Sequence, residues 1–179
     1  FWAKHVTATG RDTETPDRAA LKKAALGTPA GFLAFGFGSG LSPIAPGTMG
    51  TLVAVPFAVV LKSLPALWYG VFLLLTFALG VVLCGRVSRD LGLHDHGGIV
   101  WDEMVGYWLA VALLPNQWQW LLAAFVLFRF FDIFKPWPIR QFDKKVSGGF
   151  GIMIDDVVAG LYTLVLLAGL AGFSGHLSV

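Results

Sequence analysis

Long apolar runs separated by short polar segments dominate the chain from about residue 49 onward. Five of these runs predict helices embedded in a membrane, at residues 49–61, 67–84, 99–114, 118–134 and 152–173. The first and third are short for crossing about 30 Å of hydrocarbon, so we expect those helices to tilt, to extend into their flanks or to thin the bilayer locally. Tight connections at residues 62–65 and 115–117 predict antiparallel helix hairpins.

The first 28 residues differ from the rest because they are polar and charged. Residues 16–26 fit a short amphipathic helix on a membrane surface, and a disordered tail fits the same composition. The glycine-rich apolar stretch at residues 31–40 is too short to cross a bilayer, which favours a re-entrant or interfacial element. The predicted fold is an all-α, polytopic membrane helix bundle of about five transmembrane helices. Its parts are a tail or surface helix (1–28), an embedded domain (29–173) and a short C-terminal tail (174–179).

The composition supports a protein that is in contact with lipid. Hydrophobic residues make up 56% of the 179 residues and charged residues only 13%, against about 25% charged residues in soluble domains. The mean hydropathy is +0.71. The net charge of +2 is too small to indicate a nucleic-acid partner, and a single cysteine, Cys84, excludes an internal disulfide. The expected surroundings are a lipid bilayer, and the sequence specifies no oligomeric state.

Basic residues gather on one side of the predicted topology. With five spans, the N-terminal region, the loop after the second span and the segment around the end of the fourth span share that side. The positive-inside rule makes this side cytoplasmic. Lys62 lies on the other side, and the basic residues of the cytoplasmic side are Lys4, Arg11, Arg18, Lys22, Lys23, Arg86, Arg89, Arg129, Lys135, Arg140, Lys144 and Lys145.

Two pairs of acidic residues, Asp102 with Glu103 and Asp155 with Asp156, occur in matching sequence frames. Each pair follows a glycine and three apolar residues, and each precedes a further apolar run. A carboxylate near a helix N-terminus complements the helix dipole, which explains one member of each pair. It does not explain why two adjacent acids occur in both pairs. Carboxylates beside hydrocarbon are costly and usually functional, and clustered oxygen ligands suit hard cations such as Mg²⁺. The pairs therefore predict a Mg²⁺ site at the membrane surface.

Asp132 falls at the same predicted depth as the acidic pairs and is a further candidate ligand. Arg129 lies three residues earlier, so the two share a helix face. Lys135 and Arg140 follow closely. These cations either form a ladder of ion pairs with Asp132 or bind the oxygens of a phosphate group.

The loop before the third predicted span contains His94, Asp95 and His96. Two histidines without a cysteine or a third histidine are a weak zinc signal, and acid–base catalysis, phosphate orientation and a solvated loop all fit. Glycine runs at residues 97–98 and 148–151 precede both acidic helices, where their N–H groups could bind phosphate or form turns. Carboxylates, a divalent cation and basic side chains together indicate phosphate-ester chemistry at the interface.

Five motifs follow one another between residues 31 and 172. They are residues 42–50 (SPIAPGTMG), 94–97 (HDHG), 99–103 (IVWDE), 131–139 (FDIFKPWPI) and 148–160 (GGFGIMIDDVVAG). Together they closely resemble the phosphatidylglycerophosphatase A family. The resemblance implies a Mg²⁺-dependent enzyme of the bacterial inner membrane, active at the cytoplasmic face. Such an enzyme takes an anionic phospholipid, phosphatidylglycerophosphate, and converts it to phosphatidylglycerol and inorganic phosphate.

The residues and the resemblance together assign three sets of roles. Catalytic roles fall to His94, Asp95, His96, Asp102, Glu103, Asp132, Asp155 and Asp156. Metal ligation falls to Asp102, Glu103, Asp132, Asp155 and Asp156. Substrate binding falls to Arg129, Lys135 and Arg140, and the resemblance implies the same for Ser42 and Thr48.

Several alternatives stay open at this point. The nucleophile is either water or a carboxylate, and two acidic pairs could hold one or two metal ions. A divalent-cation transporter would use the same acidic cluster, although transporter sites usually lie near the bilayer midplane and nearby cations would repel a permeating ion. A CDP-alcohol phosphotransferase would need a longer, aspartate-rich signature that the sequence does not contain.

Overall fold

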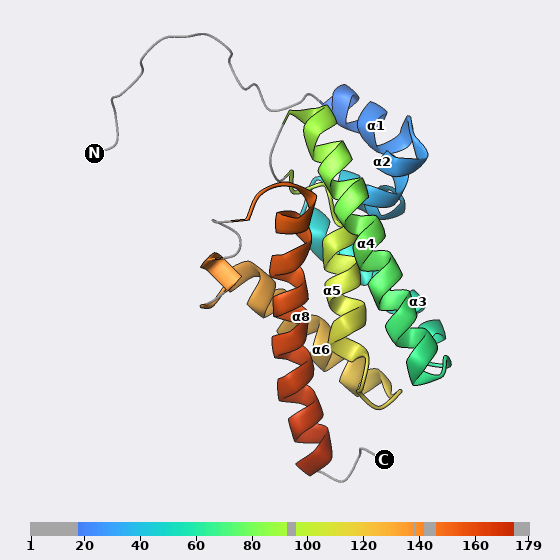
Figure 1. Cartoon of the computed structure of the whole chain (residues 1–179), viewed down its shortest axis with the longest axis vertical. Coiled ribbons are helices and arrows are strands. Elements are labelled where there is room, and N and C mark those ends of the chain that lie inside the picture. The colour runs from blue at the N-terminus through green and yellow to red at the C-terminus, as the bar shows by residue number, and fades with distance from the viewer. Residues whose placement is uncertain (1–17, 93–95, 138, 142–145, 174–179) are drawn as a thin grey trace, which may run out of the picture.

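The structure, a computed structural model, describes residues 18–92, 96–137, 139–141 and 146–173. The regular elements of this part of the chain are helices. The all-α class is confirmed, and the five predicted apolar segments coincide with the last five of these helices (Figure 1). The elements are α1 (Arg18–Leu26), α2 (Pro29–Ala34), the 3₁₀ helix η1 (Gly36–Leu41), α3 (Pro46–Leu61), α4 (Ala66–Leu91), α5 (Trp101–Val111), α6 (Trp118–Phe134) and α8 (Gly148–Phe173).

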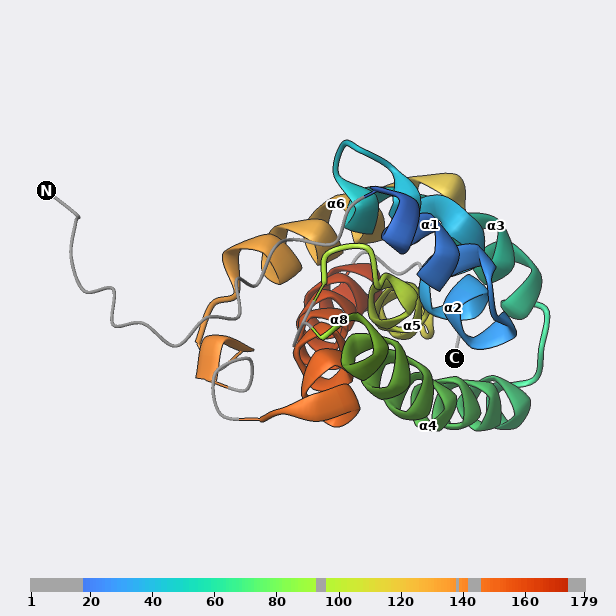
Figure 2. The ribbon, with the colours of Figure 1, turned by 90° about the horizontal axis from the view of Figure 1, so that it is seen from above.

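Helix α5 lies in the middle of the bundle, and α3, α4, α6 and α8 pack around it (Figure 2). Nine of its eleven residues are buried. Its aromatic side chains carry polar groups that reach three different neighbours. Trp101 Nε1 donates to Thr76 O on α4 at 3.1 Å, Trp108 Nε1 donates to Ala54 O on α3 at 3.0 Å, and the Tyr107 hydroxyl donates to Leu121 O on α6 at 3.0 Å. These bonds fix the position and rotation of α5.

The fourth neighbour, α8, meets α5 through glycines rather than through polar groups. A Cβ atom built on Gly160 would lie 2.4 Å from the carbonyl oxygen of Gly106, which is closer than real Cβ contacts. Small residues at such a crossing let two backbones approach closely, as in many membrane helix pairs. The close approach places Asp156, four residues before Gly160, beside the first turns of α5.

Membrane association is supported by two long helices. Helices α4 and α8, each of 26 residues, are long and apolar enough to cross a membrane by length and composition, and α3 is a shorter apolar helix. Large apolar side chains such as Leu74 on α4 and Val165 on α8 are 71% and 69% exposed. Exposed apolar side chains in this number mark an interaction surface, and a bilayer would cover them.

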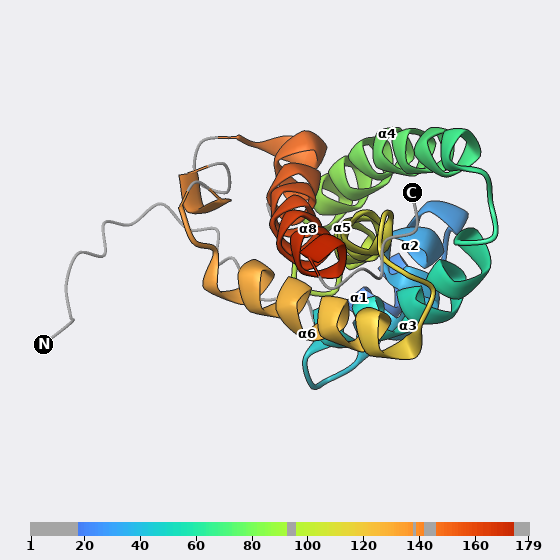
Figure 3. The same cartoon turned by 90° about the horizontal axis from the view of Figure 1, so that it is seen from below.

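Helix α5 differs from its prediction because it does not extend into its flanks. Its 11 residues correspond to about 16 Å, well short of a bilayer core. Neighbouring helices enclose it, so protein rather than lipid surrounds most of its length (Figure 3). Length and composition therefore support two candidate membrane spans in the described part of the chain, fewer than the five expected.

The two predicted hairpins have different outcomes. Helices α5 and α6 pack on each other across the connection at residues 115–117, as predicted. Helices α3 and α4 are joined by a tight turn but do not pack along their lengths, because α3 packs on α5 and α4 packs mainly on α8. Lys62 in this turn donates to Val111 O at 2.8 Å and also to Leu114 O, which caps the C-terminal end of α5. Burial lowers the pKa of the Lys62 ammonium group below its usual range.

The N-terminal region gathers at one end of the bundle, beside the end of α4 and the beginnings of α5 and α8 (Figure 1). Residues 18–26 form a helix, in agreement with the surface-helix alternative, whereas residues 1–17 lie outside the described residues. The stretch at residues 31–40 forms α2 and η1, an irregular element with Phe37 at a φ of 59°. Basic residues of α1 and of the last turns of α4 share this end, and Lys62 lies at the opposite one.

This arrangement predicts on which side of the membrane each end of α4 is exposed. Twenty residues separate the beginning of α4 from Arg86, and they rise by about 30 Å, enough to cross the hydrocarbon core. In a Cys84→Ser background, we expect a membrane-impermeant maleimide to label Ser63→Cys in intact cells. Arg86→Cys, at an exposed position, should be labelled only after permeabilisation. Labelling of both cysteines in intact cells would contradict the topology.

Candidate active site

The first turn of α5 is positioned by hydrogen bonds from the segment that precedes it. The N–H of Val100 donates to Ala34 O of α2 at 2.9 Å, and the N–H of Ile99 donates to His96 O at 2.7 Å. These bonds keep residues 99–100 out of the helix, so α5 begins at Trp101. Asp102 and Glu103 therefore lie in the first turn, as the sequence predicts.

The second acidic pair lies deeper in its helix than the sequence predicts. Helix α8 begins at Gly148, so Asp155 and Asp156 lie about two turns after its start rather than at its opening. The beginning of α8 packs tightly on α4, since a Cβ atom on Gly149 would lie 1.9 Å from Val81 O. Stabilisation by the helix dipole is limited to the first turn, so it does not explain this pair.

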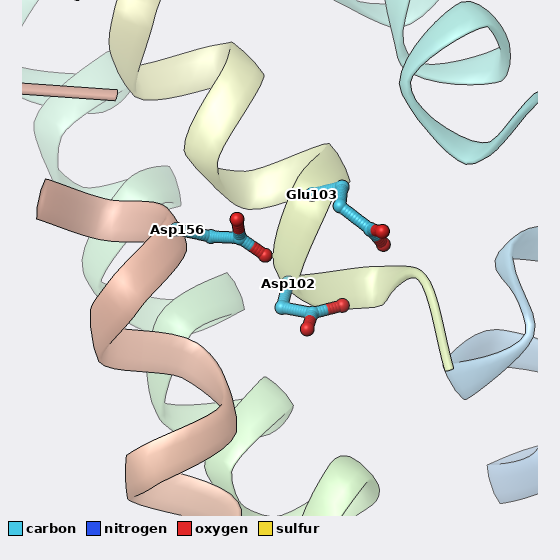
Figure 4. Close-up of side chains that lie close together, drawn as sticks. All are labelled: Asp102, Glu103 and Asp156. Carbon is cyan, nitrogen blue, oxygen red and sulfur yellow. The ribbon is translucent and has the colours of Figure 1, made fainter. Parts of the chain in front are cut away.

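Three carboxylates from α5 and α8 converge in the bundle. One ligand atom from each of Asp102, Glu103 and Asp156 lies within 4.8 Å of the other two. Figure 4 shows Asp156 reaching from α8 toward the first turn of α5, where Asp102 and Glu103 lie. Asp102 and Asp156 are only 6% and 3% exposed. We call these three residues the carboxylate cluster.

The carboxylate cluster fits a divalent cation. Its three candidate ligands are all carboxylates, and oxygen ligands suit a hard ion. Glu103 Oε2 and Asp156 Oδ1 are buried, and no group in the described part of the chain donates a hydrogen bond to them. Buried carboxylate oxygens are normally satisfied by a donor or a metal. A bound cation would also offset the repulsion among three close negative charges.

Asp132 and Arg129 border the carboxylate cluster from α6. Arg129 Nη1 lies 2.5 Å from Asp132 Oδ2 and 3.6 Å from Glu103 Oε1, and all three side chains are largely buried. The carboxyl group of Asp132 also contacts that of Asp156. Arg129 is therefore held by carboxylates and steadies two of them from the side of α6. The predicted pairing of Arg129 with Asp132 along one helix face is present.

Lys135 and Asp155 form a separate ion pair beside the carboxylate cluster. Lys135 Nζ lies 2.6 Å from Asp155 Oδ2, and the Asp155 side chain is 8% exposed. Lys135 ends α6 with a left-handed backbone, at a φ of 43°. This conformation is unfavourable for a residue with a Cβ atom. Lys135 thus pairs across to Asp155 on α8.

The remaining candidate residues lie in several different segments of the chain. Arg140 is exposed in the segment after α6, and Thr48 lies in the first turn of α3. The Ser42 hydroxyl donates to Ile44 O at 2.8 Å, so it shapes its own loop. His96 is half-buried, and its Nδ1 accepts a hydrogen bond from the N–H of Gly98 at 3.0 Å. His94 and Asp95 lie outside the described residues.

Gly47 is a functional candidate that was not singled out from the sequence. A Cβ atom at this position would lie 2.1 Å from Glu103 Oε1 and 3.1 Å from Arg129 Nη1. The beginning of α3 therefore touches the carboxylate cluster, and a side chain at residue 47 would have to displace the Glu103 carboxylate. The signal was present in the motif at residues 42–50, but the contact connects segments more than fifty residues apart in the sequence.

Comparison with known proteins gives matches to one family. The family model described as phosphatidylglycerophosphatase A matches residues 32–171. The chain is 53% identical to phosphatidylglycerophosphatase A of Escherichia coli (strain K12) over 84% of this chain and 86% of the relative. It is also 53% identical to the protein of that name in Haemophilus influenzae, over 82% of this chain and 91% of the relative.

A less similar relative has a different name. A putative phosphatidylinositol-3-phosphatase of Bacteroides thetaiotaomicron is 41% identical over 74% of this chain and 87% of that protein. No solved structure matches the chain. Because the family model covers most of the chain and two relatives are 53% identical over more than four fifths of it, the chain belongs to the phosphatidylglycerophosphatase A family and is a phosphatase.

Proposed function

We propose that this protein removes the terminal phosphate from phosphatidylglycerophosphate, which yields phosphatidylglycerol and inorganic phosphate. The reaction requires Mg²⁺ held by Asp102, Glu103 and Asp156, and it takes place at the cytoplasmic face of the bacterial inner membrane. The observation that carries the proposal is the convergence of three carboxylates, of which Asp102 and Asp156 are buried, in a chain of this family.

The relatives support a lipid phosphomonoester as the substrate. Phosphatidylglycerophosphate and a phosphatidylinositol 3-phosphate, the lipids for which the relatives are named, both carry a phosphomonoester on the headgroup. The higher identity to the two phosphatidylglycerophosphatases favours the glycerol headgroup. The alternative of a divalent-cation transporter finds no support among these relatives, which are named as phosphatases.

The side chains around the carboxylate cluster have distinct tasks in this proposal. Mg²⁺, when bound, polarises a phosphoryl oxygen and neutralises charge in the transition state. Arg129 orients Glu103 and Asp132, and Lys135 orients Asp155. The N–H groups of Gly47 and Thr48 belong to the first turn of α3, next to Glu103. Free N–H groups at the beginning of a helix favour binding of a phosphate group. The scissile phosphate would thus lie between α3 and the carboxylate cluster.

The cytoplasmic location is supported by the charge at this end of the bundle. Arg18, Lys22 and Lys23 on α1 and Arg86 and Arg89 on α4 lie at the end where α5 and α8 begin. Positively charged loops and helix ends are retained on the cytoplasmic side during membrane insertion. The carboxylate cluster lies toward the same end, so a headgroup in the cytoplasmic leaflet would reach it.

Removing one ligand charge should abolish turnover. We expect Asp102→Asn and Asp156→Asn each to lower phosphate release from phosphatidylglycerophosphate by at least about a hundredfold, because each change removes a negative charge from a pre-organised site. Activity of the unaltered protein should disappear with a chelator and return with Mg²⁺.

The matched control is Asp90→Asn. Asp90 is exposed and forms only a surface ion pair with Arg86, so the same change of atoms there should leave activity within about twofold. Near-normal turnover in Asp102→Asn or Asp156→Asn would remove that residue from the site. Full activity in a chelator would refute the metal requirement.

Lys135 offers a test that separates charge from backbone strain. We expect Lys135→Ala to lose most turnover at every salt concentration, because Asp155 then lacks its buried partner. Lys135→Gly should lose as much activity, yet be more stable than Lys135→Ala by about 1 kcal/mol, since glycine accepts the left-handed backbone. Turnover and thermal unfolding in detergent would measure the two effects.

The control for this pair is Arg86→Ala, which breaks an ion pair with 65% and 68% exposed partners. It should change neither activity nor stability appreciably. If Lys135→Ala retains full kcat, the ion pair with Asp155 has no part in the reaction.

A further inference from the structure

A cavity lies at the same end of the bundle as the carboxylate cluster. It has a volume of about 440 Å³ and is enclosed by α1, by the turn that leads into α3 and by the loop before α5. Its lining contains Arg18, Lys22, Ser42, Pro46, His96 and Gly98. None of the described residues that line it is acidic. Asp17 and Asp95, which neighbour the lining in the sequence, lie outside the described residues.

The polar groups of this cavity are suited to an anion. Arg18 and Lys22 are four residues apart on α1, so they lie on one face of that helix. Because His96 Nδ1 accepts the hydrogen bond from Gly98, the proton of the neutral ring is on Nε2, which is a donor. A guanidinium, an ammonium and an imidazole N–H together favour phosphate oxygens.

The cavity and the carboxylate cluster are neighbours but use different residues. Pro46 lines the cavity, and the next residue, Gly47, touches Glu103. Gly98 lines the cavity as well, four residues before Asp102. The cations beside the carboxylate cluster, Arg129 and Lys135, come from α6 and do not line the cavity. A ligand with two phosphate groups could therefore occupy both places.

We infer that this cavity binds the phosphodiester group of the lipid substrate while the phosphomonoester lies at the carboxylate cluster. The inference rests on the proposed function, because phosphatidylglycerophosphate carries both groups, joined by a glycerol unit. The lipid named for the Bacteroides relative has the same combination. Helix α1 lies outside the residues that match the family model, so this chain supplies part of its substrate site from its own N-terminal region.

The structure provides a matched pair of lysines for a test. Lys22 lines the cavity, whereas Lys23 is its neighbour on α1, is likewise exposed and is not part of the lining. We expect Lys22→Ala to raise KM for phosphatidylglycerophosphate about three- to tenfold, with kcat within about twofold, because the diester does not react. Arg18→Ala should act in the same way. Lys23→Ala should leave both constants within about twofold.

Product inhibition identifies which phosphate the cavity holds. Phosphatidylglycerol retains only the diester, so its inhibition should weaken in Lys22→Ala by the same factor as KM. Inhibition by inorganic phosphate, which imitates the monoester, should be unchanged. A weaker inhibition by inorganic phosphate alone would assign the cavity to the monoester and overturn the inference. Equal KM values in Lys22→Ala and Lys23→Ala would also overturn it, since general attraction of anionic lipid would then explain both.

Failure of the proposed function would be recognised separately, by absence of phosphate release from phosphatidylglycerophosphate in the unaltered protein. Retention of phosphatidylglycerol by the full chain in native mass spectrometry then decides the cavity assignment without turnover. Weaker retention in Lys22→Ala than in Lys23→Ala supports the cavity as a diester site. Equal retention refutes it.

Discussion

Two carboxylates enter the middle of the bundle on the first turn of α5, and the surrounding helices hold that turn in place. The polar groups of Trp101, Tyr107 and Trp108 bind α4, α6 and α3, while glycines let α8 approach. Because neighbouring helices surround α5, the first turn that carries Asp102 and Glu103 is fixed within the bundle. The third carboxylate, Asp156, arrives from α8. Burying these negative charges is costly, and a bound cation would offset that cost.

Much of the fold follows from the sequence because helix formation in an apolar run is largely a local property. The five runs became α3, α4, α5, α6 and α8. The pairing of Arg129 with Asp132 also follows from local spacing, since residues three apart share a face. The acidic residues could be selected as candidate site residues because a local explanation, the helix dipole, fails for two adjacent acids. Family motifs then supplied the chemistry.

Contacts between distant segments determine the features that could not be predicted from the sequence. The two acidic pairs have the same local frame, yet α5 begins just before its pair and α8 begins two turns before its own. The difference arises because Ala34 binds the N–H of Val100, a contact from another part of the chain. Lys135 likewise crosses to Asp155 on α8, and Gly47 meets Glu103. Periodicity carries no information about such partners.

The central claim is that Asp102, Glu103 and Asp156 bind a divalent cation. Crystals grown with Mn²⁺ in place of Mg²⁺ would test it directly, because anomalous diffraction locates the ion. The account predicts a peak among the three carboxylates, about 2.0–2.2 Å from their oxygen atoms as expected for Mg²⁺-like coordination. A peak on other residues, or none at the carboxylate cluster in protein that needs the metal for activity, would contradict it.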